Sequence, residues 1–123
     1  MGIRRTKHAV YDCKYHMVWT PKYRKQILND EMRGYLEEVF QHIAEEYECS
    51  IGTMEVMEDH VHIFLEVTPR YALAEVVQII KSISAGEIFK KYPNLRKQLW
   101  AHELWNDGYF IRSVGDKVTA EII

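Results

Sequence analysis

The chain has 123 residues and a formal net charge of −2, with 47% hydrophobic and 28% charged residues. These values fit one globular domain over residues 1–123 and exclude a disordered chain. No apolar run reaches the roughly 20 residues that cross a bilayer, and no apolar stretch follows the basic N-terminus, so we expect no membrane association and no secretory signal. Cys13 and Cys49 lie outside any CxxC pattern, which argues against a disulfide scaffold and favours a cytoplasmic protein.

Charge is distributed unevenly along the chain. Residues 1–25 carry seven Lys or Arg and one acid, whereas residues 30–66 carry eleven acids and one Arg. From Lys81 onward basic residues again outnumber acids. Such segregation can build one basic face that attracts phosphate groups, although charged helix surfaces alone produce the same pattern.

The first half of the chain predicts a strand followed by a helix. Residues 9–20 alternate between two faces as a strand does, and Pro21 ends the pattern. Asn29 is a suitable helix cap with acids directly after it. Apolar residues then recur at three- and four-residue steps to about residue 47, which predicts an amphipathic helix with its glutamates facing solvent.

The second half predicts two strands, a helix and a last strand. Residues 50–57 and 60–67 read as strands joined by a tight turn. A helical pattern starts at Leu73 and ends before Pro93, and residues 108–114 read as a final strand. The order predicts an α+β fold, a ferredoxin-like βαββαβ sandwich in which both helices lie on one face of an antiparallel sheet.

The sharpest chemical signal is His60-Val61-His62. On a strand, residues i and i+2 point to the same side, so both imidazoles would face one patch. Imidazole is the commonest metal ligand among side chains, and Glu58 or Asp59 could add an oxygen ligand. The motif alone also fits two half-buried, hydrogen-bonded histidines, and the other four histidines show no metal-ligand spacing. No phosphate-binding glycine loop is present, so we expect no nucleotide cofactor.

Several stretches together resemble the single-tyrosine HUH transposases of small bacterial and archaeal insertion sequences, the IS200-like transposase family. The stretches that carry the resemblance are Tyr15-His16-Met17-Val18-Trp19-Thr20-Pro21-Lys22-Tyr23-Arg24, Glu55-Val56-Met57-Glu58-Asp59-His60-Val61-His62-Ile63-Phe64, Lys81-Ser82-Ile83-Ser84-Ala85, Leu99-Trp100, Leu104-Trp105 and Gly108-Tyr109-Phe110-Ile111-Arg112-Ser113-Val114-Gly115. Their order and spacing agree with the family over most of the chain, which is far more specific than two histidines.

The resemblance implies a homodimeric enzyme that cuts and rejoins single-stranded DNA beside hairpins. It implies that His60 and His62 hold Mg²⁺ or Mn²⁺. A tyrosine hydroxyl would attack the scissile phosphate and form a covalent 5′-phosphotyrosine, which conserves the ester bond for rejoining without a nucleotide cofactor.

The end of the chain departs from the family pattern. The family's nucleophilic tyrosine, and a glutamine ligand one turn later, lie on a helix beyond Ile123. Thr119 resembles the cap of a helix of which the chain holds only the first turn, which favours a clipped domain over a natural inactive remnant. Tyr109 lies in the predicted last strand and is not assigned as the nucleophile.

Basic segments are the candidate DNA contacts. Lys22, Arg24 and Lys25 beside Tyr23 combine phosphate-binding cations with a ring for base stacking, and Arg4 and Arg5 would extend that path. Two other readings stay open: a catalytically inactive single-stranded DNA-binding module of the same fold, and an RNA-binding ferredoxin-like domain with structural histidines. A tyrosine encoded after Ile123 would separate the enzyme from the inactive module.

Overall fold

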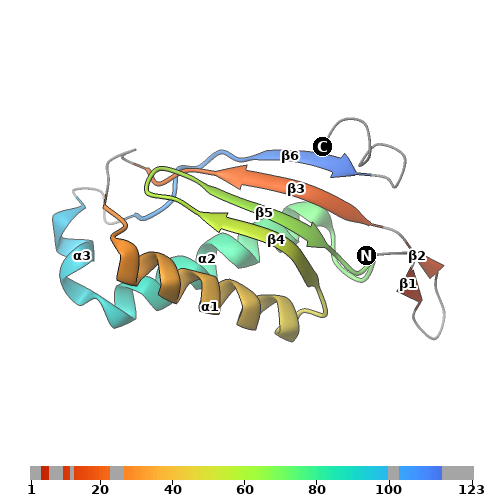
Figure 1. The fold of residues 1–123 in the computed structure, drawn as a ribbon, viewed down its shortest axis with the longest axis horizontal. Helices are drawn as coiled ribbons and strands as arrows, with labels where there is room; N and C mark the ends of the chain where they lie inside the picture. Colours follow the sequence, from red (N-terminus) through yellow and green to blue (C-terminus); the bar gives the residue numbers. More distant parts are fainter. Residues whose placement is uncertain (1–3, 6–9, 12, 23–26, 100–102, 115–123) are drawn as a thin grey trace.

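Four antiparallel strands form the central sheet in the order β4-β5-β3-β6 (Figure 1). They are β3 (Lys14–Trp19), β4 (Ser50–Val56), β5 (Val61–Glu66) and β6 (Phe110–Val114). The structure is a computed structural model that describes residues 4–5, 10–11, 13–22, 27–99 and 103–114, the first two pairs by their backbone only.

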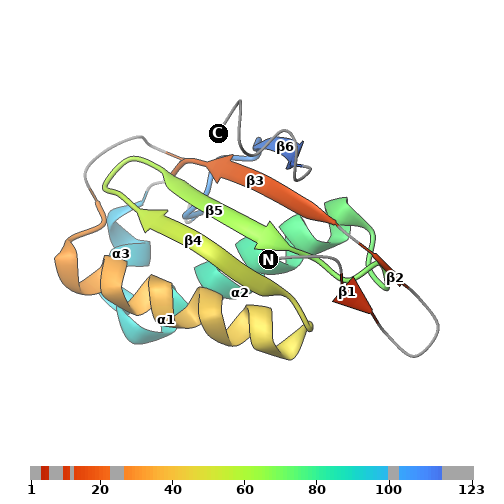
Figure 2. The same cartoon turned by 45° about the vertical axis from the view of Figure 1, so that its right-hand side comes forward.

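Three helices accompany the sheet: α1 (Asp30–Glu46), α2 (Leu73–Lys91) and the short α3 (Pro93–Gln98). Both views show α1 and α2 on the same side of the sheet (Figures 1 and 2). The amide of Met32 donates to the side chain of Asn29 at 2.9 Å, so the predicted cap begins α1. The strand order and the one-sided helices confirm the ferredoxin-like prediction.

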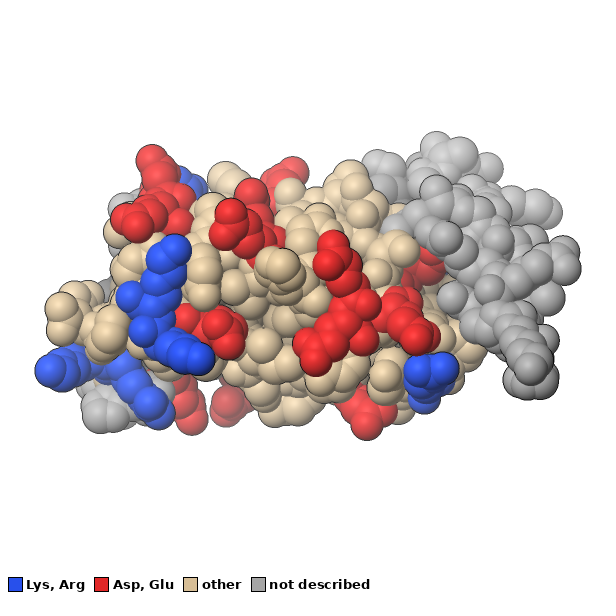
Figure 3. All heavy atoms as spheres, turned by 90° about the horizontal axis from the view of Figure 1, so that it is seen from below, with Lys and Arg blue, Asp and Glu red and all other residues tan. Residues whose placement is uncertain are grey.

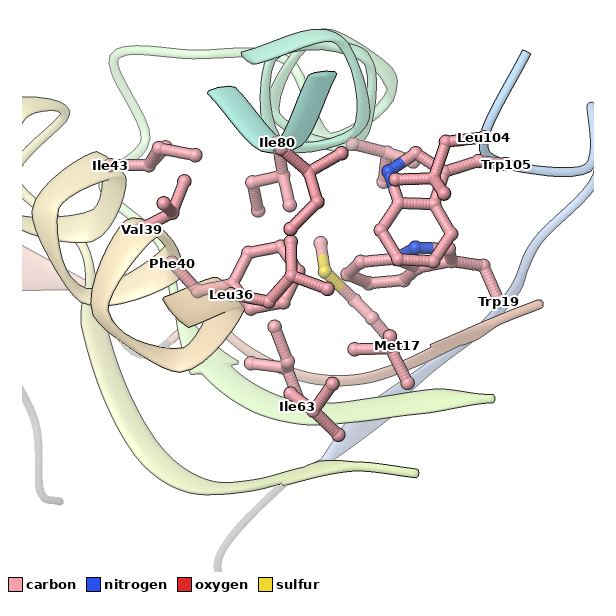
Figure 4. Close-up of a cluster of buried hydrophobic side chains, with 14 of the residues drawn as sticks. Met17, Trp19, Leu36, Val39, Phe40, Ile43, Ile63, Ile80, Leu104 and Trp105 are labelled. Carbon is pink, nitrogen blue, oxygen red and sulfur yellow. The ribbon is translucent and has the colours of Figure 1, made fainter. Parts of the chain in front are cut away.

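The helix side of the sheet holds the core. Met17 and Trp19 of β3 and Ile63 of β5 are at most 2% exposed, and they pack against Phe40 of α1 and Ile80 of α2 (Figure 4). Burial of this apolar surface is the main stabilising contribution to the fold. Because strand side chains alternate, the residues between these core positions point to the other face.

We call that other side the outer face of the sheet. Strand register aligns its side chains in rows across β4, β5, β3 and β6. One row is Glu55, His62, Val18 and Phe110, and the next is Thr53, Phe64, His16 and Arg112. The first row lies next to the end of the sheet where the 57–60 turn joins β4 to β5, which we call the turn end.

The structure corrects three element predictions. The strand predicted over 9–20 is two strands, because β2 (Val10–Tyr11) pairs with β1 (Arg4–Arg5) in a separate sheet and β3 starts only at Lys14. The segment from Pro93, for which the sequence pattern predicts neither a helix nor a strand, begins α3, since proline suits the first turn of a helix. The final strand starts at Phe110 rather than 108, and the predicted helix start at Thr119 lies outside the described residues.

No helix among the described residues combines the length and the apolar character that a membrane span requires.

Candidate functional site

His62 points to the outer face from β5, one of the two central strands of the sheet. Its backbone pairs with Glu55 on one side and Val18 on the other. The flanking residues Val61 and Ile63 are at most 1% exposed on the core side. The buried neighbours therefore fix the strand, and alternation directs the His62 ring away from the core.

The side chain of His16, from the neighbouring strand β3, contacts the side chain of His62. The Nδ1 atom of His16 lies 2.7 Å from Nε2 of His62, and the ring centroids are 4.8 Å apart. Burial, and then the positive charges that His62 and Arg112 can carry, lower the pKa of His16 below its ordinary value. A contact of 2.7 Å between two ring nitrogens requires that one of them donates and the other accepts.

His60 lies in the turn that precedes β5, where its backbone carbonyl accepts from the amide of Met57 at 2.8 Å. Its Nδ1 atom is 2.9 Å from a carboxylate oxygen of Asp59, and 39% of its side chain is exposed. A carboxylate on one ring nitrogen orients the ring and leaves Nε2 for another ligand. Asp59, one of the two candidate oxygen ligands, thus contacts His60 itself, and the other candidate, Glu58, lies outside the strand.

His60 and His62 offer the kind of donor atoms that a divalent cation binds. Each ring has one nitrogen engaged by a neighbouring side chain and a second nitrogen left to bind, which is the usual arrangement of metal-ligating histidines. Across the described ranges, no three His, Cys, Asp or Glu side chains form a metal-holding group. Any further ligand would have to be another group, water or a phosphate oxygen.

Aromatic and cationic side chains flank the histidine pair on the outer face. Phe64 meets His16 edge-on, with ring centroids 5.0 Å apart. Phe110 is 60% exposed in the row of His62, and the exposed Arg112 is paired with His16. A ring for a base and a guanidinium for a phosphate therefore lie beside the candidate metal ligands.

Among the basic residues predicted to contact DNA, only Lys22 has a described side chain. Lys22 is half-buried at the turn end of the sheet and forms a 2.5 Å ion pair with Glu103. Tyr23, Arg24 and Lys25 lie outside the described residues. Strand β3 runs from Lys14 to Trp19, so Lys22 follows it at the same end of the sheet as His60.

Arg4 and Arg5 lie elsewhere. They form β1, whose partner β2 precedes the other end of β3, so the sheet separates them from Lys22 (Figure 1). Within one chain Arg4 and Arg5 therefore do not adjoin Lys22, and their role as DNA contacts stays a prediction. The side chains of Arg4 and Arg5 are not described.

The helix side of the molecule is unsuited to a polyanion over much of its area. Figure 3 shows acidic side chains spread across this side and basic ones gathered mainly at one end. The acids include exposed glutamates of α1, and the last turns of α2 and α3 carry the basic residues Lys90, Lys91, Arg96 and Lys97.

Sequence reasoning missed His16 and Arg112 as parts of the site. Their separation in sequence gives no motif, and only the strand order, which places β3 between β5 and β6, brings them beside His62. The predicted fold contained that order, because a ferredoxin-like sheet has its first strand between the third and the fourth. Combining it with strand alternation would have found both residues.

Comparisons with known proteins agree with this architecture. Residues 9–123 match the family model described as IS200-like transposase. The ISDra2 transposase TnpA of Deinococcus radiodurans is 38% identical over 122 residues, which cover 99% of this chain and 87% of that protein. The transposase of insertion sequence element IS200 from Salmonella typhimurium is 30% identical over 115 residues, covering 94% and 75%.

Solved structures of transposases also match this chain. A crystal structure of a candidate transposase from Deinococcus radiodurans matches with a TM-score of 0.83 and 33% identity over 97% of this chain and 92% of that chain. A REP-associated tyrosine transposase solved with a REP hairpin matches with a TM-score of 0.62 and 10% identity, covering 92% and 62%, and shares the fold. From the family model and the two curated relatives together, we conclude that the chain belongs to the IS200-like transposase family.

Proposed function

We propose that this transposase domain binds single-stranded DNA beside a hairpin and presents one phosphodiester to a metal site at His60 and His62. The observation that carries the proposal is the position of His62 on the outer face at the turn end, where the loop after β3 also begins. DNA-binding residues and a metal site must lie close together if one phosphate is to reach both. A protein of this fold was solved with a hairpin, so a DNA hairpin is the first ligand to test.

His60 and His62 would hold Mg²⁺ or Mn²⁺, and no nucleotide cofactor is required. A bound divalent ion would supply Lewis-acid polarisation of a phosphate oxygen and offset the charge that builds there. Neighbouring side chains of this chain would orient the two ligands and add positive charge. Asp59 orients the His60 ring, His16 orients the His62 ring, and Arg112 adds a positive charge on the same face.

Cleavage itself requires a nucleophile that we place after Ile123. A tyrosine hydroxyl would form a bond to phosphorus while the bond to the 3′ oxygen breaks, which leaves a 5′-phosphotyrosine and a free 3′-hydroxyl. Rejoining reverses the exchange. Tyr109 is not suited to this role, because it lies outside β6 with the Lys81 ammonium 5.9 Å from its ring centroid, on the α2 side.

Metal binding is tested by calorimetry with Mn²⁺. We expect saturable binding to the wild-type chain and its loss in His60→Ala and His62→Ala, with an unchanged far-ultraviolet circular dichroism spectrum. His42→Ala is the matched control, because His42 is exposed on α1. Unaltered Mn²⁺ affinity in the two site variants would show that the assignment is wrong.

DNA binding is tested by fluorescence anisotropy with a hairpin that carries single-stranded flanks. The affinity should fall steeply with salt, because Lys and Arg displace counterions from phosphates. Lys25→Ala should lower the slope of log affinity against log salt by about 1. Arg70→Ala, an exposed residue at the opposite end of the sheet, should not change it. A flat salt response, or equal affinity for an unrelated duplex, would contradict the proposal.

The homodimer, which the family resemblance implies, and the cytoplasmic location, which the cysteine usage favours, stay predictions. Light scattering of the purified chain tests the first. The inactive DNA-binding module remains the alternative function, and it predicts hairpin binding with no tyrosine in the coding sequence after Ile123.

A further inference from the structure

The contact between His16 and His62 joins two adjacent strands of the outer face. By register His16 lies opposite Phe64 and His62 lies opposite Val18, so the two histidines are diagonal neighbours across β3 and β5. Their nitrogens are nevertheless 2.7 Å apart, with an interplanar angle of 43°. The Phe64 ring packs edge-on against His16 at 5.0 Å. The geometry is therefore fixed by strand pairing and by a packed ring.

Two neutral imidazoles can share this hydrogen bond in two ways. In the first, the Nε2–H group of His62 donates to the Nδ1 lone pair of His16, and the Nδ1 lone pair of His62 stays available. In the second, the Nδ1–H group of His16 donates to Nε2 of His62, whose own proton must then be on Nδ1. His62 then has no lone pair left to offer a cation.

We propose that His16 is a positioning residue that accepts the Nε2–H hydrogen bond of His62 and thereby leaves the Nδ1 lone pair of His62 for a divalent cation. This inference rests on the proposed function, because it assumes the metal site at His60 and His62. It gives His62 the same kind of support that Asp59 gives His60, since each ring is held through one nitrogen and offers the other.

Burial makes this support necessary. The His62 side chain is partly buried between neighbouring strands, so water cannot replace a lost partner as freely as it could at an exposed turn. Without an acceptor at His16, both the tautomer and the ring orientation of His62 would become mixed. A mixed population lowers the apparent affinity in proportion to the competent fraction. The lost hydrogen bond also makes the other ring nitrogen of His62 a weaker donor to a cation, which lowers the affinity further.

The test compares an apolar variant with one that keeps an acceptor. His16→Leu removes the acceptor, whereas His16→Asn keeps a side-chain oxygen near the position of Nδ1. We expect Mn²⁺ affinity, measured by calorimetry, to fall about 10- to 100-fold in His16→Leu and to recover largely in His16→Asn. His42→Leu, at the exposed histidine of α1, should bind Mn²⁺ like the wild type.

A second measurement does not depend on metal. The ¹⁵N chemical shifts of the His62 ring report which nitrogen carries the proton. We expect protonated Nε2 to predominate in the wild type and in His16→Asn, and mixed tautomers in His16→Leu. Titration with Zn²⁺, a diamagnetic probe, should shift Nδ1 of His62 and leave Nε2 protonated.

The outcomes separate the two proposals. If His60→Ala abolishes Mn²⁺ binding but His16→Leu binds like the wild type, the role of His16 is overturned while the metal site stands. Protonated Nδ1 on His62 in the Zn²⁺ complex also overturns it. If Mn²⁺ binding is absent from the wild type, or survives in both His60→Ala and His62→Ala, the proposed metal site is wrong. The proposed role of His16 is then wrong as well.

Discussion

The indole Nε1–H of Trp105 donates a 2.9 Å hydrogen bond to the hydroxyl of Ser84. Ser84 is fully buried on α2, and Trp105 lies in the segment that leads to β6. The Ser84 hydroxyl in turn donates to the carbonyl oxygen of Lys81 at 3.2 Å. The bond thus joins α2 to the chain that precedes the last strand of the sheet.

Ser84→Ala should destabilise the fold by about 1–3 kcal/mol, because it leaves the buried indole N–H of Trp105 without its acceptor. The free energy of unfolding in urea measures the loss. Ser82→Ala, at an exposed serine of the same helix, should change it by less than about 0.5 kcal/mol. Equal losses in the two variants would mean that the hydrogen bond contributes nothing specific.

Lys81 holds the same segment through its ammonium group. Its Nζ atom donates to the carbonyl oxygens of Asn106, Asp107 and Gly108 at 2.6, 3.2 and 3.2 Å. Burial lowers the pKa of Lys81, and the charge of Asp107 partly opposes that shift. One charged donor therefore replaces water for three backbone acceptors directly before β6.

Lys81→Met should release this segment, because the three carbonyl groups lose a charge-assisted donor. We expect faster amide hydrogen exchange in β6, which has β3 as its neighbour, and little change in the β4–β5 hairpin. Lys90→Met is the matched control, since Lys90 is exposed on the same helix. Unchanged amide hydrogen exchange in β6 would show that Lys81 does not hold this segment.

The fold could be predicted largely from local patterns, because its main signals lie within single elements. The cap at Asn29 and the three- and four-residue apolar steps define α1 without any distant contact. Alternation in β5 places Ile63 in the core and His62 outside it. The break between β2 and β3 could not be read this way, because it depends on which strands pair and the alternating pattern continues through it.

The candidate site was predictable only in part. His60 and His62 form a motif because they lie two residues apart on one chain segment. His16 and Arg112 come from strands far away in the sequence, and tertiary pairing alone brings them to His62. The partner of His60 was missed for a different reason: the sequence offered Glu58 and Asp59 only as alternative sources of an oxygen ligand, whereas the turn directs the Asp59 carboxylate to the imidazole.

The contact between Tyr35 and Glu87 makes a prediction about alkaline pH. The Tyr35 hydroxyl donates to the Glu87 carboxylate at 3.4 Å. Burial, then the negative charge of Glu87 and this hydrogen bond, raise the pKa of Tyr35 above its ordinary value of about 10. Glu38 adds a smaller contribution in the same direction, while the Lys91 ammonium lies 4.2 Å from the Tyr35 ring centroid.

The folded state therefore keeps the Tyr35 proton at a pH where the unfolded chain has lost it, so stability falls as pH rises above about 10 and is unaffected below. In urea titrations from pH 8 to pH 11, Tyr35→Phe should lose less stability than the wild type over that interval. Glu87→Gln should also flatten the dependence, because it removes the carboxylate charge while an amide oxygen still accepts the hydroxyl. Parallel curves for all three proteins would show that Tyr35 ionises equally in the folded and unfolded states.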